Sequence, residues 1–253
     1  MASYNYTKNT LLYNSNASSP YAVQYRWVNA PPLSGSVYDD EFNGTSFSST
    51  WTSFNATSFV PTITARDDYD GTWMRLSRTA APSGFRGYVK TTPTGDWTLI
   101  TRLIVNDRTY SNGVGHNAFL LLVGDPANPS TSAITMFGVY FFSTGAPIIW
   151  GQNNSNYTTY SSSIFTDISL PVDYVNYYLR VIKSGTSFSF SYSGDGNTWT
   201  LAASGKTLAF TVSGFGIGTE TWTPSSIGPD FDFFRYYPAT PRTIGRTYNL
   251  RTN

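Results

Sequence analysis

The stretch from Tyr177 to Thr200 constrains the fold more than any other, because apolar and polar side chains alternate along it at period two. Three aromatic rings alternate with serines over residues 187–192, as in a strand with one buried face and one solvated face. Ser184-Gly185 and Asp195-Gly196 supply turns, and we expect Gly196 to adopt the positive φ angle of a tight hairpin turn. The stretch predicts two or three antiparallel strands and no helix.

The same pattern of short apolar runs separated by Gly, Pro, Asn and Asp clusters continues over most of the chain, which is typical of a sandwich or barrel. About twelve such strands would form two sheets with inner faces about 10 Å apart. The uninterrupted apolar run 118–123 predicts a strand that is buried on both faces. Outside the central stretch we expect strands at Tyr38–Phe42, Trp51–Asn55, Thr62–Ala65, Thr72–Arg78, Arg86–Lys90, Trp97–Asn106, Asn117–Gly124, Ala133–Phe142, Pro147–Trp150, Thr198–Ala202, Leu208–Ser213, Gly214–Thr219 and Phe231–Tyr236.

Three segments resemble the concanavalin A-like (laminin G-like) β-sandwich domains. Leu179-Arg180, an aromatic strand and the turn Ser193-x-Asp195-Gly196-x-x-Trp199 form the first segment. The segment 39–44 followed by Trp51 resembles the first strand of such domains, and the segment 231–235 resembles the last strand, which pairs beside the first. The resemblance covers residues 38–238. It implies an all-β, two-sheet jelly-roll sandwich and a tendency toward glycan binding, but the fold does not define a function. Such domains occur in lectins, as accessory domains of glycoside hydrolases and in phage surface proteins.

Composition excludes several classes of function. The chain of 253 residues can form one large all-β domain, and it has no cysteine for disulfides or thiolate metal sites. A net charge of +1 with 12% charged residues argues against nucleic-acid binding and against a polybasic membrane anchor. There is no apolar run of about 18 residues, and the N-terminus lacks the apolar core of a signal peptide. We therefore expect neither a nucleic acid nor a membrane among the partners.

The two ends of the chain differ from the sandwich. Residues 1–37 carry six tyrosines and tryptophans without periodicity and end near Pro31-Pro32. Such a segment is either disordered or laid along another surface. Its aromatic rings favour an extended arm that docks on identical subunits or on other virion proteins. Residues 239–253 form a tail with three arginines and no acid. This tail is either a frayed terminus or a second docking segment.

Candidate catalytic groups are few. The chain has two glutamates, Glu41 and Glu220, and one histidine, His116. A glycosidase requires two facing carboxylates about 5–10 Å apart, and no spacing in the sequence indicates such a pair. His116 lies between glycine-rich residues and is interpreted as a surface residue. We therefore expect a protein without enzymatic activity.

Acidic residues near the first and last strands suggest a weaker alternative. If these strands are neighbours, Asp39, Asp40 and Asp232 could offer oxygen ligands to a structural calcium ion, which the resembling family often holds. The favoured interpretation is ordinary edge-strand acids that discourage sheet-to-sheet pairing. We therefore expect no cofactor, with structural calcium as the alternative.

The segment from residue 150 to residue 160 is the richest candidate for binding, because it mixes aromatic rings with side-chain amides. Sugars stack their C–H faces on rings and need planar hydrogen-bonding groups for their hydroxyls. The same mixture suits a protein interface, and Trp150 could also be a core residue. The predicted carbohydrate-binding residues are Trp150, Asn153, Asn156, Tyr157, Tyr160 and Trp222.

These observations together predict a non-enzymatic structural or adhesion protein of a bacteriophage virion, as a capsid decoration or as a tail or fibre component. The absence of cysteine and of a signal peptide, the low charge and the two terminal segments favour a protein that folds in the host cytoplasm and joins a particle. Host surface glycan is the expected external ligand. The alternative is a carbohydrate-active enzyme or its carbohydrate-binding module.

Overall fold

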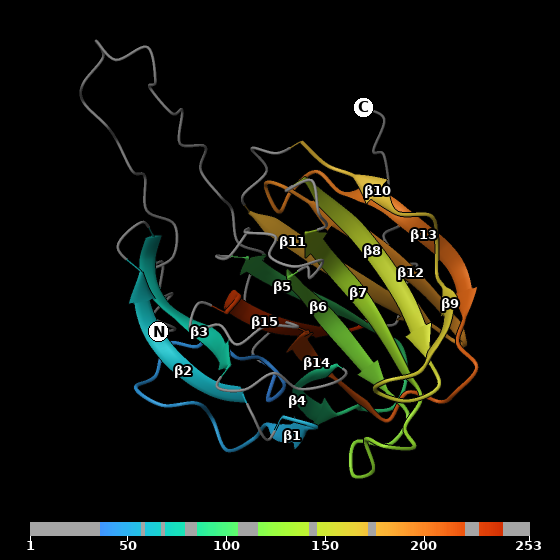
Figure 1. The fold of residues 1–253 in the computed structure, drawn as a ribbon, viewed down its shortest axis with the longest axis horizontal. Helices are drawn as coiled ribbons and strands as arrows, with labels where there is room; N and C mark the ends of the chain where they lie inside the picture. Colours follow the sequence, from blue (N-terminus) through green and yellow to red (C-terminus); the bar gives the residue numbers. More distant parts are fainter. Residues whose placement is uncertain are drawn as a thin grey trace, which may run out of the picture.

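The computed structural model describes residues 36–56, 59–66, 69–78, 85–105, 116–141, 146–171, 176–220 and 228–239. These ranges contain the strands β1 to β15 and no helix, and the strands form two antiparallel sheets that pack face to face (Figure 1). The predicted all-β sandwich is therefore confirmed. No helix that could cross a membrane occurs in these ranges.

One sheet has eight strands and the other has seven. The eight-stranded sheet runs β1 (Thr52–Phe54), β4 (Arg86–Thr91), β14 (Gly214–Thr219), β6 (His116–Val123), β7 (Ile134–Phe141), β8 (Pro147–Asn154) and β10 (Ile168–Ser169), with β9 (Tyr160–Ser163) also paired to β8. The seven-stranded sheet runs β13 (Thr200–Thr207), β12 (Ser187–Ser193), β11 (Tyr177–Ser184), β5 (Trp97–Ile104), β15 (Asp230–Pro238), β3 (Tyr69–Arg78) and β2 (Phe59–Arg66). Strands that are consecutive in the sequence often lie apart in a sheet or in different sheets, as in a jelly roll.

Aromatic rings from both sheets meet in the main core. Phe137 of β7 lies 5.4 Å from Phe190 of β12, and Phe215 of β14 lies 5.6 Å from Trp97 of β5, between ring centroids. Full burial of such a side chain stabilises the fold by roughly 1.5–3 kcal/mol. The alternation of residues 187–192 thus places the rings of Phe188 and Phe190 in the core, as predicted. The run 118–123 is buried on both faces, also as predicted.

The turn after β12 is built by a serine and an aspartate. Gly196 has φ 74°, which confirms its predicted conformation. The Asp195 carboxylate accepts hydrogen bonds from the backbone amides of Thr198 and Asn197, and these bonds lower the pKa of Asp195. The connection spans residues 194–199 and β13 begins at Thr200, so the loop is longer than the predicted tight hairpin.

A substitution at Gly196 tests this turn. Gly196→Val forces a β-branched residue into the left-handed region, so the free energy of unfolding should fall by roughly 1–3 kcal/mol. Denaturant unfolding measures the change. Asn197→Val is the matched control, because Asn197 is exposed in the same turn and has no positive φ. Equal midpoints for the two variants would contradict the assignment of strain to Gly196.

Three strand predictions were wrong. Residues 38–42 make a single bridge, Asp40 with Phe234, because Phe42 has φ 47° and turns the chain out of the strand. The segment 208–213 forms no strand, although its apolar side chains pack against the core as parts of a loop. Strand β8 continues to Asn154 and is followed by β9 and β10, which were not predicted.

Candidate functional site

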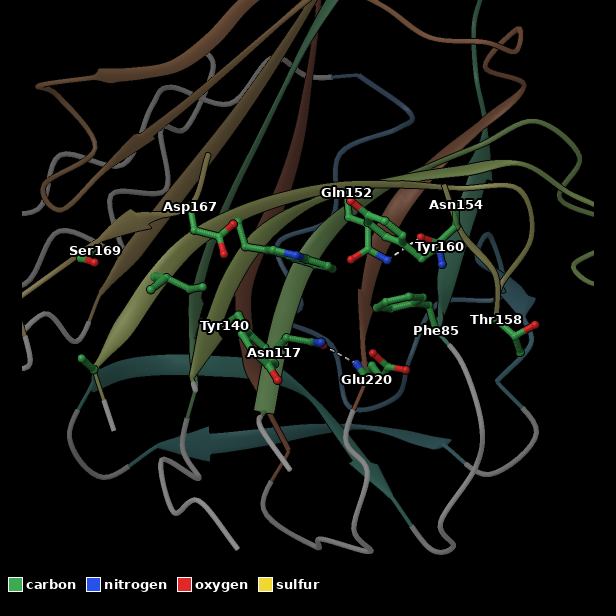
Figure 2. Close-up of a pocket in the computed structure, with 13 residues that line it drawn as sticks. Phe85, Asn117, Tyr140, Gln152, Asn154, Thr158, Tyr160, Asp167, Ser169 and Glu220 are labelled. Atoms are coloured by element: carbon green, nitrogen blue, oxygen red, sulfur yellow. Dashed lines mark hydrogen bonds between the residues drawn. The ribbon is translucent and has the colours of Figure 1, made fainter. Parts of the chain in front are cut away.

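A cavity of about 680 Å³ lies on the outer face of the eight-stranded sheet. Because side chains alternate along β8, Trp150, Gln152 and Asn154 point away from the core, whereas Ile149, directly before Trp150, belongs to it. Figure 2 shows the side chains around the cavity. The lining residues are Phe85, Asn117, Tyr140, Ala146, Ile148, Trp150, Gln152, Asn154, Thr158, Tyr160, Asp167, Ser169 and Glu220.

The cavity has an aromatic floor centred on Trp150. In the sheet, Trp150 lies directly opposite Gly138 of β7, which lies opposite Phe119 of β6. Because Gly138 has no side chain, the indole of Trp150 reaches the Phe119 ring, with 6.2 Å between centroids. Phe85 stacks on Trp150 at 5.9 Å, and Tyr140 lies 6.3 Å away. The rings of Trp150, Phe85 and Tyr140 line the cavity and offer apolar surface to a ligand.

Amide side chains frame this floor. Asn117 accepts a hydrogen bond from the backbone amide of Glu220 through Oδ1, which holds the two residues together (Figure 2). Gln152 donates through Nε2 to Oδ1 of Asn154. Asn154 is only 3% exposed, and its Nδ2 has no hydrogen-bond partner among the described residues. An unsatisfied buried donor is costly, so this amide favours a ligand that brings an acceptor.

Two carboxylates also line the cavity. Glu220 is 6% exposed and follows β14, whereas Asp167 is exposed at the rim just before β10. Partial desolvation raises the pKa of Asp167. Burial lowers the pKa of Arg86, and the charge of Glu220 opposes that shift, so Arg86 and Glu220 interact electrostatically. Among the described residues, those around the cavity include no lysine, arginine or histidine.

The structure separates the predicted sugar-binding residues. Trp150 and Tyr160 line the cavity, on its floor and at its rim. Asn153 lies on the opposite face of β8, where its Oδ1 accepts a bond from Thr135 Oγ1 at 2.7 Å. It therefore does not belong to this site.

Two of the other three predicted residues, Asn156 and Tyr157, are not among the residues that line the cavity. Asn156 caps its own turn, because its Oδ1 accepts hydrogen bonds from the backbone amides of Thr158 and Thr159. Tyr157 packs against the apolar cluster beneath the cavity. Trp222 lies outside the described residues.

Sequence reasoning missed several of the lining residues. Asn117, Tyr140, Ile148 and Ser169 form one row across β6, β7, β8 and β10, so only the strand register brings them together. Gln152 lay within the predicted binding segment, but its direction depends on the continuation of β8 to Asn154. An expected strand of that length would have placed residues 150, 152 and 154 on one face.

The two glutamates do not form a pair. Glu41 binds the Arg235 guanidinium of β15 through both carboxylate oxygens at 2.7 Å, while Glu220 lines the cavity of the other sheet. The suggested calcium ligands are also engaged separately. Asp39 accepts a hydrogen bond from the backbone amide of Tyr236, and Asp40 accepts one from Nε1 of Trp51.

Asp232, the third suggested calcium ligand, pairs with Arg102 at 3.2 Å. In the described parts of the chain, no group of three or more His, Cys, Asp or Glu residues is placed to hold a metal ion.

No family model and no curated protein matches this chain. Solved structures do, at low identity. A xylan β-1,4-xylosidase of Bacillus halodurans C-125 matches with TM-score 0.55 and 14% identity, over 81% of this chain and 40% of that one. A bifunctional GH43-CE protein of Bacteroides eggerthii matches with TM-score 0.58 and 17% identity, over 80% and 26%. The chain therefore spans less than half of these two proteins.

A phage module matches over nearly its whole length. The CBM2 module of the evolved Dit of Lactobacillus casei BL23 phage J-1 has TM-score 0.51 and 15% identity, with 79% of this chain and 94% of the module covered. At these identities the likeness concerns the fold alone. Together with the two antiparallel sheets, it shows that the chain folds as a concanavalin A-like β-sandwich.

Proposed function

We propose that this protein is a non-enzymatic adhesion component of a bacteriophage particle that binds host-surface glycan in the cavity on β6, β7 and β8. The observation that carries the proposal is an aromatic floor, formed by Phe85, Trp150 and Tyr140, beside a buried amide donor that has no partner among the described residues. A site of about 680 Å³ falls within the usual range for small-ligand pockets and has room for a short saccharide.

The chemistry of the lining suits a sugar. A pyranose ring offers an apolar C–H face to Trp150, and its hydroxyls need donors and acceptors at the edge. Gln152 and Asn154 lie beside the floor and supply both kinds of group. Tyr160, which is 57% exposed, stands at the rim where it can cover a bound ring.

A separate observation supports the proposal that the protein is part of a phage particle. The phage Dit module is covered almost completely by the match, whereas only 26–40% of the two enzymes is covered. That difference favours a binding module over the catalytic part of an enzyme. The proposed docking arm, residues 1–35 in particular, lies outside the described residues, so its contact with identical subunits or other virion proteins stays a prediction.

A carbohydrate-active enzyme is the second candidate. The observation in its favour is that Asp167 and Glu220 line one cavity, and that the pKa of Asp167 is raised, as a general acid requires. Release of new reducing ends from a bound oligosaccharide, abolished by Glu220→Gln, would support this candidate. Binding without cleavage supports the adhesion proposal.

A matched pair of tyrosines tests the location of the site. Tyr160→Ala should weaken retention on host cell-surface polysaccharide roughly fivefold, because it removes one stacking ring worth about 1 kcal/mol, while the melting temperature stays nearly unchanged. Tyr157→Ala is the control. It removes a ring that packs against the cluster beneath the cavity, so it should lower the melting temperature and retain binding.

The opposite pattern would move the site. If Tyr157→Ala abolished retention and Tyr160→Ala did not, the ligand would lie on the other side of the 155–160 loop. If the parent protein bound no glycan on a broad array, the adhesion proposal would lose its ligand.

A further inference from the structure

We propose that the cavity selects uncharged saccharides and excludes anionic ones, such as uronic acids, sialic acids and phosphorylated sugars. This inference rests on the proposed glycan binding and adds the class of ligand. It combines three observations on the described residues: two carboxylates in the wall, no cationic side chain among the described lining residues, and one buried amide donor without a partner among them.

The two carboxylates are not equivalent. Glu220 is buried, and the nearby charge of Arg86 offsets part of its own charge. The Arg86 guanidinium is held by the backbone carbonyl of Asn55 through Nη1 at 2.8 Å, and it does not line the cavity. Asp167 makes no ion pair with any described residue. The negative potential of the cavity therefore comes mainly from Asp167.

An anionic sugar would meet this potential without compensation. Its carboxylate would lose water on entering a space floored by Trp150, Phe85 and Tyr140, and it would approach Asp167 with a charge of the same sign. Buried charges are tolerated when they are paired, and arginine is the usual partner of a carboxylate or phosphate ligand. The described part of the lining offers no such partner.

A neutral sugar has complementary groups. Its hydroxyls can donate to the carboxylates of Asp167 and Glu220, and a hydroxyl or ring oxygen can accept from Nδ2 of Asn154. Satisfying that amide removes the cost of a buried donor that has no partner among the described residues. The same polar groups that repel an anion therefore bind a neutral ring. Discrimination arises from the repulsive element as much as from the attractive one.

Paired ligands test the inference with the intact chain. The probes are oligosaccharides that differ only at C6, as hexose or as hexuronate, measured by titration calorimetry at low salt. We expect neutral oligomers to bind at least ten times more tightly than the corresponding uronates. Added salt should reduce this ratio, because it screens the charge of Asp167 at the exposed rim.

Two variants separate local charge from net charge. Asp167→Asn should reduce the neutral-to-uronate ratio at least threefold. Asp96→Asn makes the same change of net charge on the loop before β5, outside the cavity, and should leave the ratio as in the parent. The melting temperature of each variant shows that it is folded.

The outcomes distinguish this inference from the proposed function. Uronates that bind as tightly as neutral sugars, or a ratio that Asp167→Asn does not change, would overturn charge selection while glycan binding stands. A parent protein that binds neither member of any pair would overturn the proposed function itself.

Discussion

Gly138→Ala is expected to lower the free energy of unfolding by at least about 3 kcal/mol, which is large for a single methyl group. A Cβ atom at residue 138 would collide with the backbone carbonyl oxygen of Ala118 and would lie 2.6 Å from Cβ of Phe119. Both atoms are fixed to the backbone of β6, so no rotamer change relieves the contact. Strands β6 and β7 would have to separate at the centre of the eight-stranded sheet.

This substitution should also disturb the cavity floor. Trp150 contacts the Phe119 ring across Gly138, where no side chain stands between them. Denaturant unfolding measures the stability, and glycan titration measures the site in whatever fraction folds. Gly44→Ala is the matched control, since the nearest atom to a Cβ there is Ser46 O at 3.4 Å and the residue is exposed. A Gly138→Ala protein as stable as the Gly44→Ala protein would show that the two strands can adjust.

The strands of this fold were predictable where their side chains alternate or where both faces are apolar. The rings of Phe188 and Phe190 and the run 118–123 lie in the core as expected. Strands β9 and β10 were not predictable, because they are four and two residues long and consist mostly of serine. Pairing with β8, rather than any property of their own residues, makes them strands.

The site was predictable only in part for the same reason. Trp150 and Tyr160 stand in a segment whose composition indicates sugar binding, and both line the cavity. Asn117 and Glu220 come from distant parts of the chain and meet through a backbone hydrogen bond to a side chain. Nothing in the sequence near either residue indicates the other. Composition can indicate a candidate binding segment, but the wall of a cavity depends on strand register.

Glu41→Ala is expected to cost about 3 kcal/mol of unfolding free energy, because it leaves Arg235 buried without the carboxylate that binds it. The Arg235 side chain is 4% exposed and the Glu41 side chain 18%, and two bonds of 2.7 Å join them. Burial alone would lower the pKa of Arg235, but the hydrogen bonds and charge of Glu41 outweigh burial and raise it. The pair therefore fastens the segment around residue 40 to β15.

Lys183→Met supplies the control, because it removes one charge from a more exposed ion pair. In that pair the Lys183 side chain is 22% exposed and the Asp96 side chain 40%. Such a surface pair contributes between about 0 and 1 kcal/mol. Chemical unfolding should separate the two variants clearly, and glycan binding of folded Glu41→Ala protein should match the parent. If instead Glu41→Ala kept its stability, the segment around residue 40 would be fastened to β15 by its other contacts, such as the Asp40–Phe234 bridge and the bond from the Tyr236 amide to Asp39.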